Sequence, residues 1–156
     1  MENIAIVNPE NARLSQEICK LASGSETPVT RGTFLPDLLF NKQNTGIRYV
    51  ARQGYWRFVG PVMYVQGYIK ISLKGSKTGK AIIANLPFPS IDDVILMPQI
   101  INVGCMAGMH MTPTCWAEIT PGNSYLDLYT TNGQALTNTS FGDSSAIRFS
   151  GYYFAE

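Results

Sequence analysis

Alternation of apolar and polar residues dominates the chain after about residue 33, and residues 62–73 show it most clearly. The apolar positions of this segment are Met63, Val65, Ile69, Ile71 and Leu73. The intervening positions are Tyr64, Gln66, Tyr68, Lys70 and Ser72. A period of two places successive side chains on opposite faces of a strand, so the segment predicts a half-buried strand. Gly67 falls on the apolar side, where it indicates a bend or a bulge.

Nine such segments, bounded by Gly, Pro and Ser, are strand-like, and together they predict roughly eight or nine strands. They are residues 33–40, 46–52, 55–60, 62–73, 80–86, 99–108, 114–120, 124–131 and 146–155. Pro36 marks the first as an edge or bulged strand, and Gly54 indicates a hairpin-like arrangement between the second and third. No segment after residue 32 has a convincing helical period. We therefore expect an all-β domain, an antiparallel β-sandwich of jelly-roll type.

The N-terminal segment has a different pattern, which predicts a short helix. Asn8 suits the cap position and Pro9 the first helical position. The apolar stripe of this helix consists of Leu14, Ile18 and Leu21. Three turns are marginally stable alone in water, so the helix must pack on its own domain, a neighbouring subunit or another protein. The chain thus divides into a helix and linker for attachment or trimerisation (1–31) and a β-domain (32–156).

Composition agrees with one globular domain built from strands and turns. The 156 residues are 45% hydrophobic and 15% charged, with 14 Gly and 9 Pro. The N-terminus has acids where a signal peptide needs bases, and no apolar run approaches the roughly 20 residues of a membrane span, so membrane insertion is not expected. Three scattered cysteines (Cys19, Cys105 and Cys115) indicate synthesis in a reducing compartment, with a Cys105–Cys115 bridge as the alternative.

Charge is nearly balanced overall but unevenly distributed. Lys and Arg number 12 against 11 Asp and Glu, which gives a net charge of +1 and argues against nucleic-acid binding. Residues 42–91 contain basic residues and no acid, whereas residues 92–156 contain acids and one base, Arg148. Two explanations remain open. Strands from the two halves alternate and their charges cancel, or the basic residues form a face that attracts an anionic surface polymer.

Several short motifs follow one another along the chain: GYWRFVG (54–60), the turn at 75–79, Leu86-Pro87-Phe88 and IRFSGYY (147–153). Their order and spacing resemble a domain found at the C-termini of bacteriophage tail fibres and tailspikes. The resemblance extends from about residue 32 to the C-terminus. It implies a β-sandwich that assembles as a parallel homotrimer and contacts host-surface glycans during adsorption.

The same resemblance implies a location in the virion, on the phage tail or capsid surface, after synthesis in the host cytoplasm. The N-terminal helix would then attach the chain to another virion protein. Fibres normally have a long shaft before this domain, whereas about 30 residues precede it here. The chain is therefore either a fragment, a short receptor-binding protein, or a structural head-fibre, decoration or connector protein without glycan binding.

Catalysis has little support in the sequence. The only histidine, His110, is not accompanied by a Gly-x-Ser-x-Gly nucleophile motif. Glu118 and Asp127 lie on neighbouring predicted strands, where a pair of carboxylates could approach, but solvated or salt-bridged acids are favoured. We expect a protein without catalytic residues, enzymatic activity or a cofactor.

A sulfur-rich cluster surrounds the histidine, formed by Cys105, Met106, Met109, His110 and Met111. Sulfur and imidazole ligands suit Cu(I), and three copies of His110 around a threefold axis could hold one metal ion. Methionine also fills irregular apolar gaps and subunit contacts. We favour packing in the core or at a trimer interface, so no metal site is predicted.

Aromatic residues carry the functional prediction. Tyr64, Gln66, Tyr68 and Lys70 share the outward face of the strand at 62–73 and form a candidate glycan-binding surface. Further candidates on other predicted strands are Trp56, Trp116, Tyr125 and Tyr129. Sugar rings stack on aromatic rings while polar neighbours bind the hydroxyl groups. The alternative is a trimer interface for the two tyrosines of the strand, and burial for the two tryptophans.

Overall fold

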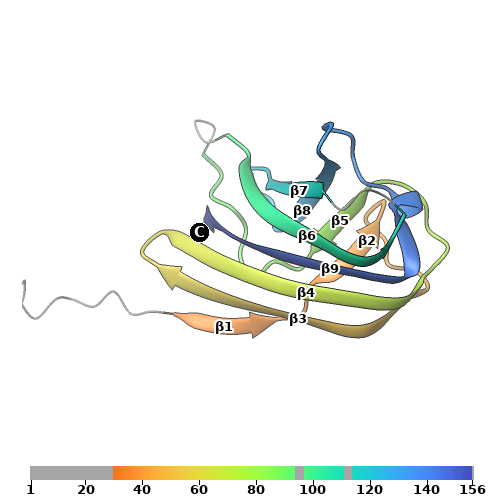
Figure 1. Ribbon diagram of the computed structural model, residues 1–156. Helices are drawn as coiled ribbons and strands as arrows, with labels where there is room; N and C mark the ends of the chain where they lie inside the picture. The colour runs from red at the N-terminus through yellow and green to blue at the C-terminus, as the bar shows by residue number, and fades with distance from the viewer. Residues whose placement is uncertain (1–29, 94–96, 111–113, 156) are drawn as a thin grey trace, which may run out of the picture.

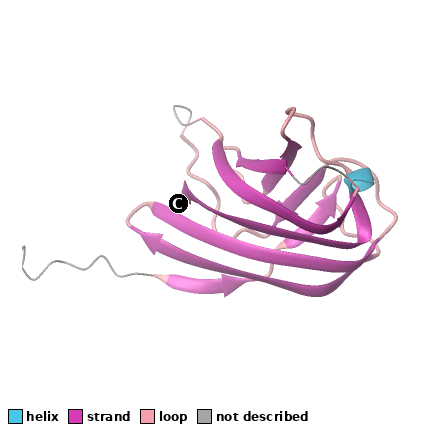
Figure 2. Ribbon diagram, viewed as in Figure 1, coloured by secondary structure: helices cyan, strands magenta, loops and turns pink. Residues whose placement is uncertain are grey.

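The computed structural model describes residues 30–93, 97–110 and 114–155, which form an all-β domain (Figures 1 and 2). The helix expected in the first 24 residues lies outside the described residues, as does most of the 1–31 segment. The described part of the chain contains no helix with the length and apolar character of a membrane span.

In this described part of the chain, nine strands form one antiparallel sheet in the order β1-β3-β4-β9-β6-β7-β8-β5-β2. Their bounds are β1 Arg31–Phe34, β2 Asp37–Phe40, β3 Ile47–Val59, β4 Val62–Lys74, β5 Ala81–Ala84, β6 Gln99–Met109, β7 Thr114–Ile119, β8 Leu126–Thr130 and β9 Phe141–Phe154. One turn of 3-10 helix, Asn138–Ser140, precedes β9. The expected all-β class is correct, but the expected two-sheet jelly-roll sandwich is wrong.

The single sheet encloses a core because it curls into a half-barrel. Figure 1 shows β3, β4, β9 and β6 as a curved layer, with β7, β8, β5 and β2 folded over it. The inner side chains of both parts form one cluster, in which Phe40 and Phe141 pack edge to face at 5.4 Å. The buried Tyr153 hydroxyl donates to the Phe88 carbonyl at 2.8 Å. A curled sheet and a sandwich bury alternate residues equally, so the sequence pattern could not distinguish them.

The predicted strand 33–40 is two strands, and Pro36 lies at the break between them. β1 is at one edge of the sheet and β2 at the other, although only Leu35 and Pro36 separate them along the chain. Proline has no backbone N–H to extend a ladder, which favours a break here. Because so short a link joins the two edges, the sheet must curl until these edges are close together.

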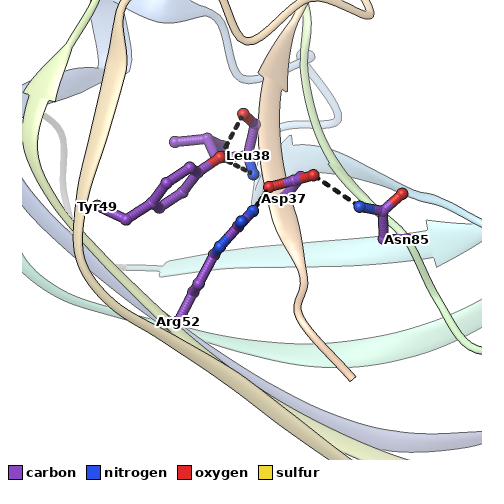
Figure 3. A network of polar contacts seen from close by, with 5 residues as sticks. All are labelled: Asp37, Leu38, Tyr49, Arg52 and Asn85. Carbon is purple, nitrogen blue, oxygen red and sulfur yellow. Dashed lines mark hydrogen bonds and ion pairs between the residues drawn. The ribbon is translucent and has the colours of Figure 1, made fainter.

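Side chains, rather than a backbone ladder, close the seam between β2 and β3 (Figure 3). The Tyr49 hydroxyl accepts a hydrogen bond from Leu38 N–H at 3.1 Å and donates one to the Leu38 carbonyl at 3.2 Å. Arg52 forms an ion pair with Asp37, which also accepts a hydrogen bond from Asn85 at 2.6 Å. Burial raises the pKa of Tyr49, so its hydroxyl stays protonated. The seam is therefore a polar clamp between two sheet edges.

β3 runs unbroken through Gly54, so the predicted hairpin at this glycine is wrong. Gly54 pairs with Gly67 of β4, and both face inward. A Cβ at Gly54 would lie 2.2 Å from the ring of Phe34, and one at Gly67 would lie 2.2 Å from the ring of Phe149. The two glycines thus make room for phenylalanine rings. No bulge occurs at Gly67; the register shifts instead between Arg48 and Ala51 of β3.

The alternation predicted for residues 62–73 is confirmed along most of β4. The buried side chains are Met63, Val65, Ile69 and Ile71. Tyr64, Gln66 and Lys70 are exposed and Tyr68 is half-buried. Leu73 departs from the pattern with 38% exposure. It is the penultimate residue of β4 and does not belong to the buried core.

One cysteine differs from the expectation of a reduced protein. Cys115, on β7, is disulfide-bonded. The side chains of Cys19 and Cys105 are not among those described. The alternative kept open from the sequence was a Cys105–Cys115 bridge; the bonding partner of Cys115 lies outside the described side chains, so this pairing stays a prediction.

Tyr49→Phe should weaken the seam by removing the hydroxyl that satisfies both backbone groups of Leu38. We expect the free energy of unfolding to fall by about 1–3 kcal/mol, the loss typical of unsatisfied buried groups. Urea denaturation followed by tryptophan fluorescence measures this change. The matched control is Tyr152→Phe, whose side chain is 59% exposed and whose effect should stay within about 0.5 kcal/mol. Equal stability of the two variants would contradict the role of the seam.

Candidate functional site

The outer face of β1, β3, β4, β9 and β6 carries aligned rows of side chains, because the strands pair in register. The central row is Thr33, Tyr55, Gln66, Ser150 and Asn102. On one side of it lies the row Arg31, Arg57, Tyr64 and Tyr152. On the other side lies the row Gln53, Tyr68, Arg148 and Gly104. Residues far apart in sequence therefore meet on one surface.

A continuous groove follows these rows. Two depressions, of about 540 and 1380 Å³, share Tyr55, Gln66 and Ser150 in their linings. The smaller extends to Tyr64 and Tyr152, and the larger extends over β9 to β6. Neither lining contains an acidic residue, although together they include three arginines, Arg52, Arg57 and Arg148. We call the two depressions together the groove.

The order of strands bears on the two explanations of the charge distribution. β1, β3 and β4 are adjacent, and their charged residues are Arg31, Arg48, Arg52, Arg57, Lys70 and Lys74. The acids Glu118, Asp127 and Asp37 lie on β7, β8 and β2, in the other half of the sheet, whereas Asp143 lies on β9, beside β4. The basic strands are therefore grouped together, and cancellation is local: Asp37 pairs with Arg52, and Asp143 accepts a hydrogen bond from the Lys74 N–H. Among described residues, Arg52 is the one base of β1, β3 and β4 in an ion pair.

One end of the outer face, near the turn between β3 and β4, is apolar. Its exposed side chains, which we call the apolar end, are Val59, Tyr64, Ile100, Tyr152 and Phe154. The rings of Tyr64 and Tyr152 lie 5.8 Å apart, and their exposed fractions are 50% and 59%. Exposed apolar clusters of this kind are typical of interaction surfaces.

The other end of the groove is polar and basic. The guanidinium of Arg148 lies over the ring of Tyr68, 5.3 Å from its centroid, in cation–π geometry. Gln53 and Arg148 flank Tyr68 directly on the neighbouring strands. With Gln66 and Ser150 in the next row, this end offers one aromatic ring together with hydrogen-bond donors and acceptors.

Three of the residues predicted to bind glycan line the groove: Tyr64, Gln66 and Tyr68. Lys70 does not, because it lies further along β4 in a separate depression of about 450 Å³ that also includes His110 and Asp143. The sequence prediction omitted Tyr55, Arg57, Arg148, Ser150 and Tyr152, which the register brings beside the predicted three. The sequence shows the alternation of these residues within each strand. It does not show which strands lie side by side or which residues pair across them.

Trp56 lies away from the groove, on the inner side of β3. Its ring packs edge-on against Phe58 at 5.8 Å and against Phe88 at 5.1 Å. All three belong to the partly buried residues around the core. The position of Trp56 agrees with the burial alternative.

The remaining aromatic candidates lie in or next to the other half of the sheet: Trp116 on β7, Tyr129 on β8 and Tyr125 directly before β8. Trp116 and Tyr129 stack at 4.7 Å, and the Trp116 indole donates to the Thr130 carbonyl at 2.9 Å. Lys42 lies over the ring of Tyr125 at 5.4 Å. None of these aromatic side chains contributes to the lining of the groove.

The two candidate carboxylates are direct cross-strand partners, Glu118 on β7 and Asp127 on β8. Asp127 forms a salt bridge with Lys80 at 2.9 Å, and Lys80 also donates to the Tyr129 hydroxyl at 3.1 Å. Desolvation lowers the pKa of Lys80, but the bonds to Asp127 and Tyr129 outweigh it and raise the pKa overall. Burial, with a further contribution from Glu118, raises the pKa of Tyr129. Asp127 thus has the salt-bridged role favoured from the sequence.

The sulfur-rich cluster is only partly described. Met109 packs against the core and His110 is exposed. The side chains of Cys105, Met106 and Met111 lie outside the described set. Within the described residues, no three His, Cys, Asp or Glu side chains come together as metal ligands would.

Comparison with known proteins finds a similar fold in a solved structure. No family model matches the sequence, and no curated protein matches it. The crystal structure of the Dettilon tailspike protein (gp208) is similar, with a TM-score of 0.63 and 14% sequence identity. The fold also occurs within a phage tailspike. The match covers 82% of this chain and 24% of the tailspike chain, so this chain corresponds to about a quarter of that protein.

The inner position of Trp56 leads to a stability prediction. Trp56→Ala should lower the free energy of unfolding by about 3 kcal/mol, the lower end of the range for large aromatic residues in cores. Leu73→Ala removes a side chain that is 38% exposed and lies outside the apolar end, and it should cost less than about 1 kcal/mol. Urea denaturation followed by circular dichroism compares the two. A larger loss for Leu73→Ala than for Trp56→Ala would contradict the packing of Trp56 against the core.

Proposed function

We propose that this protein is a non-catalytic bacteriophage virion protein that binds a glycan on the host cell surface as a homotrimer. The observation that carries the proposal is the groove on the outer face, which combines exposed aromatic rings with amides, hydroxyls and arginines and has no acid in its lining. The fold shared with part of a phage tailspike supports the virion context.

The chemistry of the groove suits a sugar. Carbohydrate rings present C–H faces that pack on aromatic side chains, such as those of Tyr55 and Tyr68. Gln53, Gln66 and Ser150 supply both donors and acceptors for hydroxyl groups. The site is open and shallow, so each copy would bind weakly. Three copies acting together on one polymer raise the overall affinity without any new contact.

The apolar end supports self-association. Val59, Tyr64, Ile100, Tyr152 and Phe154 expose apolar surface on four adjacent strands. Contact between copies at this end buries that surface, and the groove from Arg57 to Arg148 stays open to a ligand. Tyr64 then belongs to the contact between copies and Tyr68 to the glycan site. Residues 1–31 attach the trimer to another virion protein.

The apolar end also favours a second candidate function. A head-fibre, decoration or connector protein needs the contacts between copies but no ligand. In that case the groove is a consequence of strand curvature, and the trimer completes the particle without recognising the host.

Glycan binding is tested by Tyr68→Ala, with Tyr125→Ala as the matched control outside the groove. We expect Tyr68→Ala to reduce adsorption of labelled protein to host bacteria roughly tenfold, because the aromatic platform is lost in each of three copies. Flow cytometry measures adsorption, and far-UV circular dichroism checks that both variants keep the β signal. Normal adsorption by Tyr68→Ala removes this site, and no adsorption by the unmodified protein favours the structural alternative.

The oligomeric state is tested separately. Multi-angle light scattering should give three times the chain mass of 17.2 kDa. Replacing Tyr64 and Tyr152 together by Ser should shift the protein to the monomer, because both side chains lie in the apolar end. Leu73→Ser is the control, since Leu73 is also exposed but lies at the opposite end of β4. A stable monomer of the unmodified chain refutes the trimer.

A further inference from the structure

Two arginines that form no ion pair with a described residue lie at opposite ends of the groove. Arg57 stands beside Tyr64 on β3, and Arg148 stands beside Tyr68 on β9. Tyr64 and Tyr68 are four residues apart on β4, which separates β3 from β9. This amounts to about 14 Å along the strands and about 10 Å across them. The two arginine Cα positions are therefore roughly 17 Å apart on the same face.

Both guanidinium groups are available to a ligand. Each residue is exposed, and neither forms an ion pair with any residue that the structure describes. The linings of both depressions lack acids that could neutralise them. The ring of Tyr68 restrains Arg148 and leaves its N–H groups free for an anion. Arginine binds carboxylate and phosphate groups through paired hydrogen bonds, so each end of the groove is a ready anion contact.

The surface between the two arginines is polar but uncharged. Tyr55, Gln66 and Ser150 form the central row and belong to both depressions. A single acidic sugar spans far less than the distance between the arginines and would occupy one of them. A linear polymer with repeated acidic groups contacts both, while its neutral parts lie on the central row.

We propose that the groove binds a linear acidic polysaccharide, with negative groups of one chain held at Arg57 and Arg148. This inference rests on the proposed glycan-binding function and adds the charge class of the ligand and its path across β3, β4 and β9. A nucleic acid is the competing polyanion. It fits less well, because the net charge of the protein is only +1 and the centre of the groove carries no base.

The test uses the surface polysaccharide purified from the host bacterium, in native form and with its acidic groups converted to neutral ones. Biolayer interferometry on the full-length protein should show binding that weakens at least tenfold after this conversion and weakens as NaCl rises from 50 to 300 mM. Equal binding of the neutral form overturns the inference but keeps glycan binding. No binding of the native form overturns the proposed function itself. Single-stranded DNA that binds as tightly as the native polymer also overturns the inference.

Arginine variants test which side chains contact the polysaccharide. Arg57→Gln and Arg148→Gln should each weaken binding of the native polymer roughly tenfold, and the neutralised polymer should not distinguish them from the unmodified protein. Arg48→Gln is the matched control, because it removes the same charge from β3 and is exposed but lies outside the groove. Circular dichroism and light scattering confirm that each variant is folded and assembled. Arginine variants that bind like Arg48→Gln overturn the inference.

Discussion

The whole domain depends on how the two edges of its sheet meet. Only Leu35 and Pro36 link β1 at one edge with β2 at the other, so a flat sheet is impossible. The Tyr49 hydroxyl then takes the place of a missing ladder by bonding both backbone groups of Leu38, and Arg52 pairs with Asp37 beside it. This clamp holds the curl that encloses the core. The closed curl gives the apolar side of each strand an interior to fill and leaves the other side facing solvent.

The outer face follows from that closure. The core is formed by the inner side chains. The outer rows on β3, β4 and β9 contact one another, but they line the groove rather than the core and are therefore available for binding. They divide into an apolar end around Tyr64 and Tyr152 and a polar end around Tyr68 and Arg148. The two ends suit different contacts: apolar surface gains from burial against another copy, whereas exposed arginines lose hydration on burial and gain from an anion. One face can therefore serve assembly and recognition together.

Patterns of neighbouring residues predicted several elements correctly, and the predictions that failed also have a physical explanation. The alternation of residues 62–73 depends on neighbouring residues alone, so it could be predicted. Pro36 indicated an edge or bulged strand, which was correct for the edge position, but the break into β1 and β2 was not predicted. Gly54 and Gly67 were interpreted as a turn and a bulge, because glycine is common in both. The structure uses them to admit the rings of Phe34 and Phe149, residues distant in sequence. Trp56 and Trp116 could not be assigned to a face either, since that depends on which strand lies beside each one.

From the sequence alone one could determine that the chain is a β-protein, which side of β4 is buried, and that its bases and acids occupy different segments. Only the tertiary structure decided that these strands form one curled sheet, that the basic strands are neighbours, and that Arg148 joins Tyr68 and Gln53. The reason is the range of the interactions. Side-chain direction along a strand is a property of consecutive residues, whereas strand order and register are set by contacts between segments up to about a hundred residues apart, which no local pattern encodes.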